Sequence, residues 1–316
     1  AMKAVEASGL HKSYSGVEAL RGVSFEVEPG VIYGILGPDG AGKSSIFRIL
    51  STLILPDKGS AAVMGHDVVR EYRKVRQIVG YMPGRFSLYQ DLSVEENINF
   101  FATLFGTTLK ENYHLIKDIY SQIEPFKKRK AGALSGGMKQ KLALSCALIH
   151  KPDVLFLDEP TTGVDPVSRK EFWGMLSKLA KNGLAIVVST PYMDEATLCD
   201  RVSLIRKGIF LDTDTPGRIV DKFDRVLLSA ESSRMPALLR DIRSLPEVFS
   251  CFAFGDRHHL VLKTPEEGGG GSLQDTIAGL SLRLREMGHS DVLIEPITPC
   301  IEDCYMYLDK MDRENG

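Results

Sequence analysis

The sequence predicts an α/β fold, with a mainly parallel sheet flanked by helices, followed by a smaller C-terminal α+β domain. Up to about residue 220, short apolar runs alternate with segments whose apolar residues recur at helical spacing. A glycine-rich loop joins one of these runs to a helix. From about residue 225 the order changes to strand, helix, two strands, helix, strand. A chain of 316 residues has room for about two domains. We therefore expect domains at 1–222 and 223–316.

Residues 1–30 alternate apolar and polar side chains, which predicts antiparallel strands that end at the turn Glu28–Gly30. Tyr14 falls in the loop between two of these strands. Two interpretations of this residue stand: its ring stacks on an adenine, or it is a half-buried strand aromatic without a ligand.

The next apolar run, Val31–Leu36, predicts a buried strand, and helical spacing begins at Ser44. The intervening Gly37–Ser44 matches G-x-x-x-x-G-K-[ST], the phosphate-binding P-loop. Glycines let the backbone approach a phosphate, and bare N–H groups at a helix start attract anions. Lys43 would reach the β- and γ-phosphates, and the Ser44 hydroxyl would bind Mg²⁺. The residues expected to bind nucleotide here are Gly37, Pro38, Asp39, Gly40, Ala41, Gly42, Lys43, Ser44 and Ser45.

Residues 61–65 and 78–82 predict further short strands, and residues of about 85–150 predict a helical subdomain. Ser93 and Glu96 have the spacing of a capping box. Phe100, Phe101, Leu104 and Phe105 repeat at helical spacing, so we expect them in the core. Ser135 is a good N-cap for a helix that two glycines open, and this helix start is a second candidate anion site.

Val154–Glu159 is an apolar run that ends in two carboxylates, as in a central parallel strand with both faces covered. Ligands bind at the carboxyl ends of such strands. Asp158 would lie near Mg²⁺, and Glu159 could hold an attacking water as a general base. The alternative is a charged strand end without a task, which the nearby P-loop disfavours. Leu184–Thr190 predicts another buried strand, and residues 202–212 predict a hairpin.

The order of elements after residue 225 is that of a ferredoxin-like domain. Gly268–Ser272 predicts a flexible loop, either natural or engineered. His258–His259 would be a surface strand pair, because no further metal ligand stands at a suitable spacing.

Composition argues against several classes of protein, namely nucleic-acid-binding, disulfide-bonded, membrane-spanning and secreted proteins. The formal net charge of −2 gives no reason to expect nucleic acid as a partner. Five cysteines without a C-x-x-C pair predict free thiols in a reducing compartment. No uninterrupted apolar stretch is long enough to span a bilayer, and no signal peptide is expected at the start. Any membrane role would therefore come through a partner.

Taken in order, the P-loop, Leu134–Gln140, Val154–Glu159 and Val164-Asp165-Pro166 resemble the motifs of ABC transporter ATP-binding subunits over residues 4–220. The segment Pro299–Tyr305 is similar to the Pro-x-x-Glu-Asp-x-Phe end of subunits that serve type-2, multidrug-type ABC exporters. Tyr81–Pro83 and Leu88–Leu92 are also similar to that subgroup.

The resemblance implies that two subunits face head to tail with two ATP molecules between them. One subunit would be this chain, and the second would be a copy or a different cassette. Tyr14 corresponds to the adenine-stacking aromatic of the family. Asp165 would belong to the loop that couples the two sites. The signature residues that would act on the partner's γ-phosphate in trans are Ser135, Gly136, Gly137 and Gln140.

The resemblance further implies a separate transmembrane permease and a cytoplasmic subunit held peripherally at the inner face of the membrane. Two residues depart from the family pattern. Gly84 stands where the family usually has Gln, and Pro191 stands where it usually has His. Both usual side chains act around the γ-phosphate and the attacking water.

Three functions remain in competition. The first is an ATPase subunit that energises a membrane exporter. The second is a soluble, non-transport ABC ATPase, which would normally carry two cassettes in one chain or a long coiled-coil insertion. The third is a nucleotide-binding regulatory half of a heterodimer with little hydrolysis of its own, which Gly84 and Pro191 favour.

Overall fold

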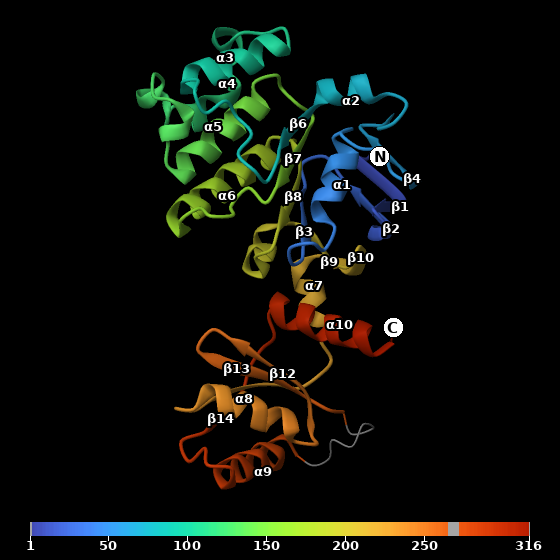
Figure 1. Ribbon diagram of the computed structural model, residues 1–316, viewed down its shortest axis with the longest axis vertical. Coiled ribbons are helices and arrows are strands. Elements are labelled where there is room, and N and C mark those ends of the chain that lie inside the picture. The colour runs from blue at the N-terminus through green and yellow to red at the C-terminus, as the bar shows by residue number, and fades with distance from the viewer. Residues whose placement is uncertain (1, 265–271, 316) are drawn as a thin grey trace. The chain divides into compact units, whose positions relative to one another are not determined.

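The computed structural model describes residues 2–264 and 272–315, and the chain divides into two compact units, Ala1–Pro216 and Gly217–Gly316. Figure 1 shows both units. The division falls at the start of α7 (Pro216–Asp221), so most of this helix lies in the second unit, although we expected the first domain to run to residue 222.

A mainly parallel sheet forms the centre of the first unit, with strand order β10-β9-β3-β8-β7-β6. The pairs of β3 with β8 and β9, and of β7 with β6 and β8, are parallel, while β10 pairs with β9 in an antiparallel hairpin. This confirms the predicted α/β class. The strands are β3 (Ile32–Leu36), β6 (Val79–Met82), β7 (Val154–Asp158), β8 (Ala185–Thr190), β9 (Arg201–Arg206) and β10 (Ile209–Asp214).

An antiparallel sheet of order β2-β1-β4-β5 lies beside it, as the alternating pattern of the first residues predicts. Helix α1 (Lys43–Leu50) packs against strands of both sheets, and the Phe47 ring meets that of Phe156 edge to face at 6.2 Å. The P-loop helix is thus anchored by the main core of this unit. The strands are β1 (Val5–Tyr14), β2 (Val17–Val27), β4 (Lys58–Val63) and β5 (His66–Asp67), and α2 (Tyr72–Ile78) follows.

The helical region predicted at 85–150 is present and gathers at one side of the first unit in Figure 1. The Ser93–Glu96 capping box is formed. Phe100 and Leu104, expected in the core, are 41% and 65% exposed, so that prediction was wrong for both. The face of α3 that is buried carries Val94, Ile98 and Ala102 instead. The helices are α3 (Val94–Leu104), α4 (Leu109–Tyr120), α5 (Gly136–Leu148) and α6 (Pro166–Lys181), with 3₁₀ turns η1 (Glu124–Phe126), η2 (Ala131–Ala133) and η3 (Met193–Leu198).

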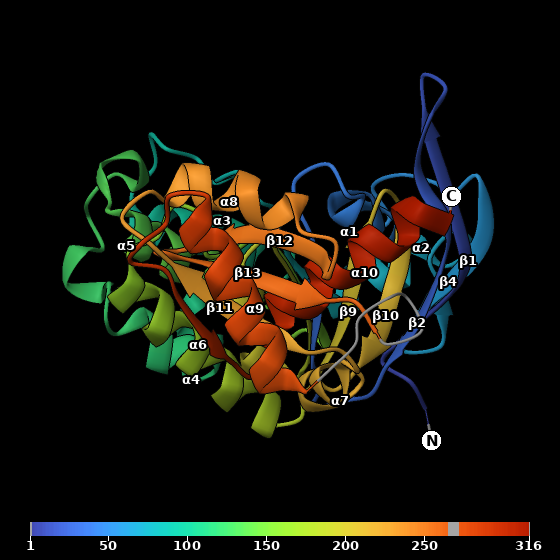
Figure 2. The ribbon, with the colours of Figure 1, turned by 90° about the horizontal axis from the view of Figure 1, so that it is seen from below.

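The second unit has the predicted β-α-β-β-α-β order, and its antiparallel sheet runs β12-β13-β11-β14, which confirms the ferredoxin-like fold. Helices α8 and α9 cover one face of this sheet (Figure 2) and supply core residues such as Leu238 and Leu284. The expected Gly268–Gly271 linker lies outside the described residues, and Ser272 caps α9. The elements are β11 (Leu227–Glu231), α8 (Met235–Ser244), β12 (Val248–Phe254), β13 (Arg257–Leu262), α9 (Leu273–Glu286), β14 (Leu293–Pro296) and α10 (Ile301–Asn315).

The histidines of β13 are buried, which corrects the expectation of a surface pair: His258 is 4% and His259 8% exposed. His258 contacts the start of α8, where its Nε2 lies 2.7 Å from the carbonyl oxygen of Met235. His259 contacts α10, a helix that we did not predict from the sequence. Its Asp303 places a carboxylate oxygen 2.7 Å from Nδ1 of His259, and the Phe254 ring stacks on the imidazole at 4.1 Å. These two histidines therefore belong to the packing of the second unit.

Candidate functional site

The P-loop connects β3 to α1, as its sequence context predicts. Gly42, the N-cap residue of α1, has φ +110°, and a Cβ there would lie 2.4 Å from the carbonyl oxygen of Ala19. Gly40 has φ +77°. Side chains are disfavoured at both angles, so these two glycines allow the chain to turn sharply into the helix. The turn leaves the first N–H groups of α1 at its open end, the arrangement that attracts anions.

Lys43 is folded back along this loop. Its Nζ donates to the carbonyl oxygens of Gly37 at 2.7 Å and Pro38 at 3.0 Å, and lies 3.1 Å from Oε1 of Glu159. The Lys43 side chain is only 3% exposed, whereas that of Glu159 is 22% exposed. An ammonium that is buried in this way needs hydrogen-bond acceptors and a negative partner, and here it has both.

A pocket of about 410 Å³ lies over the P-loop and brings residues from distant parts of the chain together. Tyr14, 40% exposed, forms one part of its wall, with its hydroxyl 3.3 Å from Oγ of Ser45. Glu159 reaches the pocket from the end of β7. The residues that line it are Tyr14, Ala19, Asp39, Gly40, Gly42, Lys43, Ser44, Ser45 and Glu159.

The two carboxylates at the end of β7 are held by one serine. Oδ1 of the buried Asp158 accepts a 2.6 Å hydrogen bond from Oγ of Ser189. The Glu159 N–H donates to the same hydroxyl at 3.0 Å and to the Ser189 carbonyl at 3.1 Å. Glu159 has φ +50°, an unfavourable conformation for a residue with a side chain. Strained backbone of this kind persists where surrounding contacts fix it, and it clusters at functional sites.

The signature residues are not among the described residues that line the P-loop pocket. Ser135 caps α5 by accepting from the N–H of Met138, and Gly136 is exposed beside it. A Cβ on the buried Gly137 would lie 2.5 Å from Oγ of Ser168 on α6, so a side chain here would clash unless Ser168 moved. The Gln140 side chain faces a different cavity.

Asp165, the expected residue of the loop between sites, caps α6. Its Oδ1 accepts from the N–H groups of Ser168 at 3.0 Å and Val167 at 3.1 Å. Hydrogen bonds from Ser168 and then from Val167 hold the pKa of the Asp165 carboxyl below its usual value. The start of α6 therefore contacts both this loop and the signature glycine Gly137.

The two departures from the family pattern lie close to this site. A Cβ on Gly84 would stand 3.1 Å from the Asp158 carbonyl oxygen and 3.8 Å from Cβ of Glu159. Pro191 directly follows Thr190, the last residue of β8. Sequence reasoning missed Ser189. The sequence signal that could have identified it is the polar pair Ser189-Thr190 at the end of an otherwise apolar strand.

A second, larger cavity of about 620 Å³ opens beside the helical layer, and both Gly84 and Glu159 line it. Its wall is largely apolar. Leu53 and Leu104 on this wall are 55% and 65% exposed, and the same wall includes Phe86, Phe101 and Phe105.

Comparisons with known proteins agree with this geometry. The ABC transporter family profile matches residues 20–162. The chain is 38% identical over 311 residues to the probable multidrug ABC transporter ATP-binding protein YbhF of Escherichia coli K12, covering 95% of this chain and 51% of that protein. The chain thus spans about half the length of that relative. It is 34% identical to the doxorubicin resistance ATP-binding protein DrrA of Mycobacterium tuberculosis, covering 83% of this chain and 79% of DrrA.

Solved structures give the same result. The chain resembles cbiO1 of Clostridium perfringens, part of the ABC transporter complex cbiONQ, with 25% identity and a TM-score of 0.63 over 70% of this chain and 92% of cbiO1. It also shares its fold with a dimeric ATP-binding cassette in a post-hydrolysis state, at 24% identity and a TM-score of 0.61, over 67% of this chain and 98% of that one. Its sequence similarity to these relatives shows that the chain belongs to the ATP-binding proteins of the ABC transporter family.

Proposed function

We propose that this chain is the ATP-binding subunit of an ABC exporter and that it binds and hydrolyses ATP with Mg²⁺ to drive transport through separate membrane subunits. The observation that carries the proposal is the pocket of about 410 Å³ in which Tyr14, Lys43, Ser44 and Glu159 meet. These residues supply an aromatic face, a cation, a hydroxyl and a carboxylate, the groups that an ATPase needs around its substrate.

The position of each group suggests its task. Tyr14, on the rim, would stack on the adenine ring. Lys43 and the N–H groups of the P-loop would bind the β- and γ-phosphates. Glu159 would accept a proton from the attacking water while it holds that water in line with the γ-phosphate.

The hydroxyl of Ser44 and the carboxylate of Asp158 are oxygen donors of the kind that Mg²⁺ prefers. Within residues 2–264 and 272–315, no group of three or more His, Cys, Asp or Glu side chains could hold a metal ion. A magnesium ion would therefore be bound jointly by few protein ligands, phosphate oxygens and water, as is usual for this ion in nucleotide sites. When bound, it would neutralise charge on the phosphates.

We also propose that the site is completed by a second ATP-binding subunit. Ser135 and Gly136 are exposed at the start of α5, where bare N–H groups can receive an anion. They do not line this chain's own pocket, so they are available for the nucleotide of a partner. Gln140 and the Asp165 loop would support that contact.

The transmembrane permease would dock on the apolar cavity beside the helical layer, and this contact would hold the chain at the cytoplasmic face of the membrane. Within the described residues no helix is long and apolar enough to cross a bilayer. Exposed Leu53 and Leu104 give the cavity a rim that a partner could cover. Because Gly84 and Glu159 line the same cavity, a segment inserted here could influence hydrolysis.

A charge placed on this rim tests the proposal. Leu104→Asp should leave the ATPase activity of the purified chain unchanged but reduce its binding to membranes that contain the permease. Leu282→Asp is a matched control, because Leu282 is 59% exposed on α9 of the second unit. Equal membrane binding by both variants would overturn the docking surface.

A second candidate function follows from Gly84 and Pro191. A subunit that lacks the Gln and His side chains would bind ATP yet turn it over slowly. Its intact signature would then serve a different cassette in an asymmetric pair.

We infer that the second unit is an accessory domain. All candidate residues for nucleotide binding and hydrolysis lie within Ala1–Pro216.

A further inference from the structure

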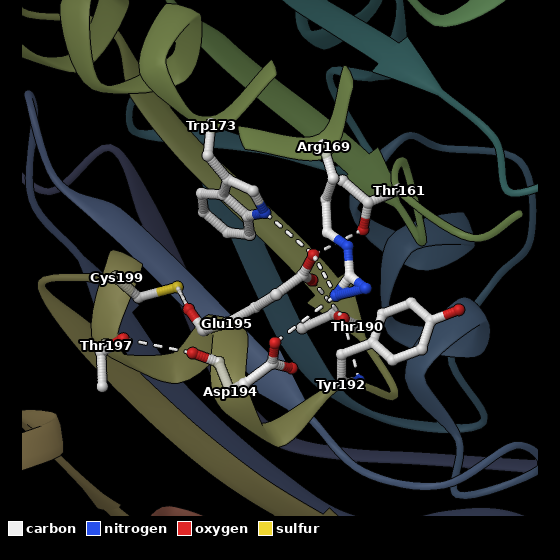
Figure 3. Close-up of polar contacts among 9 residues, drawn as sticks. All are labelled: Thr161, Arg169, Trp173, Thr190, Tyr192, Asp194, Glu195, Thr197 and Cys199. Atoms are coloured by element: carbon white, nitrogen blue, oxygen red, sulfur yellow. Dashed lines mark hydrogen bonds and ion pairs between the residues drawn. The ribbon is translucent and has the colours of Figure 1, made fainter. Parts of the chain in front are cut away.

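We propose that Glu195 is a positioning residue for ATP hydrolysis, one that holds the backbone on both sides of the catalytic carboxylate. The inference rests on the proposed ATPase function. Glu195 lies on the 3₁₀ turn η3 (Met193–Leu198), and its side chain is 1% exposed. Figure 3 shows it at the centre of a cluster of polar side chains that come from three other segments.

Three neutral donors converge on this carboxylate. Oε1 accepts from the Thr161 hydroxyl at 2.8 Å and from Nε1 of Trp173 at 3.0 Å, and Oε2 accepts from the Thr190 hydroxyl at 2.5 Å. Arg169 adds positive charge, with one guanidinium nitrogen 3.7 Å from Oε1. A buried carboxylate is costly unless it is hydrogen-bonded and paired, and here both conditions are met.

The segments tied together are the ones that carry the candidate chemistry. Thr161 stands two residues after Glu159, in the stretch that leads to Asp165. Thr190 directly precedes Pro191, and its hydroxyl also accepts from the N–H of Tyr192 at 3.0 Å. Glu195 therefore fixes the turn at the end of β8 and the loop after β7 against one another.

The backbone of Glu159 explains why this support is needed. With φ +50°, Glu159 would relax to a commoner conformation unless its neighbours held it. Ser189 holds its N–H from one side, at 3.0 Å and 3.1 Å. The bond from Glu195 to Thr161 holds the chain that leaves it. Loosening the second anchor would let the Glu159 carboxylate drift, and a displacement of about 1 Å can cost on the order of 10²-fold in rate.

Glu195→Gln tests this with little change in shape. The amide oxygen can still accept from Trp173 and Thr161, but the amide nitrogen facing Thr190 is a donor, so that bond must reverse and the Thr190 hydroxyl hydrogen loses its acceptor. We expect kcat to fall about 10- to 100-fold while KM and the calorimetric Kd for ATP stay within about twofold of wild type. Asp194→Asn is the matched control. Asp194 is next to Glu195 in the sequence, but its side chain is 76% exposed, so this variant should leave kcat unchanged.

Thr190→Val gives an independent check, because it removes the same bond from the other side. The double variant Glu195→Gln/Thr190→Val should be no slower than the worse single variant, since both act on one interaction. A merely structural role would lower the melting temperature and leave kcat untouched. That result for Glu195→Gln, or strictly additive losses in the double variant, would overturn the proposal.

Trp173 provides a readout that does not depend on turnover, because it is the only tryptophan of the chain. Its single indole N–H resonance should shift in Glu195→Gln, and in the wild type it should also shift when ATP binds. If the wild type binds ATP but shows no hydrolysis with Mg²⁺, the proposed function fails and the indole signal alone decides the role of Glu195. An indole resonance that ATP does not move would then reject it.

Discussion

The Nζ atom of Lys43 lies 3.1 Å from Oε1 of Glu159, so the cation proposed to bind phosphate and the candidate general base form an ion pair with one another. A nucleotide phosphate that reaches Lys43 would compete with Glu159 for the same ammonium. Binding would thereby release the carboxylate to act on water. We therefore expect ATP binding to break this ion pair.

Lys43→Ala should weaken ATP binding. The substitution removes a charge-assisted hydrogen bond of the kind worth about 1.5–3 kcal/mol, which corresponds to roughly one to two orders of magnitude in Kd. Isothermal titration calorimetry measures it directly. Lys128→Ala, in the exposed basic run, should bind ATP like the wild type. Unchanged affinity in Lys43→Ala would show that the P-loop does not bind the phosphates as proposed.

Removal of Mg²⁺ with EDTA should abolish hydrolysis, and Ser44→Ala should raise the Mg²⁺ concentration that gives half-maximal activity by about tenfold or more. The reason is the loss of one of few protein oxygen donors. Lys128→Ala is again the control, because Lys128 is exposed and does not line the P-loop pocket. A magnesium titration of steady-state ATPase activity distinguishes the variants. Identical midpoints for Ser44→Ala and wild type would remove Ser44 from the metal site.

Restoring the usual side chains should raise turnover if this chain's own site is weakened. In Gly84→Gln/Pro191→His we expect kcat to increase tenfold or more, since positioned proton-handling groups are typically worth ~10²–10⁴-fold. A Cβ at position 84 stands 3.1 Å from the Asp158 carbonyl, so Gly84→Ala is needed to measure the strain alone. If Gly84→Ala is as active as wild type and the double variant is no faster, the asymmetric pair is wrong.

The sequence predicted the parts of the site that are local. Gly37–Ser44 forms the turn between a strand and a helix start that directly adjoin it in the sequence, so its geometry could be anticipated. Residues joined across the sheet could not be paired in advance. The contacts of Ser189 with Asp158 and of Glu195 with Thr161 depend on strand order and on a 3₁₀ turn, and neither has a periodic signal. The pairing of Lys43 with Glu159 was hidden for the same reason.

In the fold, too, local features could be predicted from the sequence, whereas contacts between distant segments could not. Apolar patterns predicted both sheets of the first unit and the ferredoxin-like order of the second, because side-chain periodicity reports local structure. Periodicity does not say which face of a helix is covered, and so Phe100 and Leu104 were misassigned to the core. Helix α10 was not predicted, although Ile301, Cys304 and Tyr305 recur at helical spacing and are buried. A polar contact, Asp303 with His259, also holds this helix.

That contact predicts a local effect in the second unit. Asp303 accepts from His259 with one oxygen and from the Cys300 N–H at 2.8 Å with the other. Leaving a buried hydrogen-bond donor without its acceptor typically costs about 1–3 kcal/mol. Asp303→Ala should therefore lower hydrogen-exchange protection along α10, whereas Glu286→Gln, an exposed residue of α9, should not. Full protection of α10 in Asp303→Ala would show that its packing does not depend on the pair.

The central claim is that the pocket over the P-loop binds ATP and that Glu159 carries out its hydrolysis. The most direct measurement compares wild type and Glu159→Gln by calorimetry and by steady-state ATPase assay with Mg²⁺. We predict that Glu159→Gln binds ATP at least as tightly as wild type, because Lys43 no longer has to leave an ion pair, while its kcat falls ~10²–10⁴-fold. Turnover by Glu159→Gln at the wild-type rate would contradict the account.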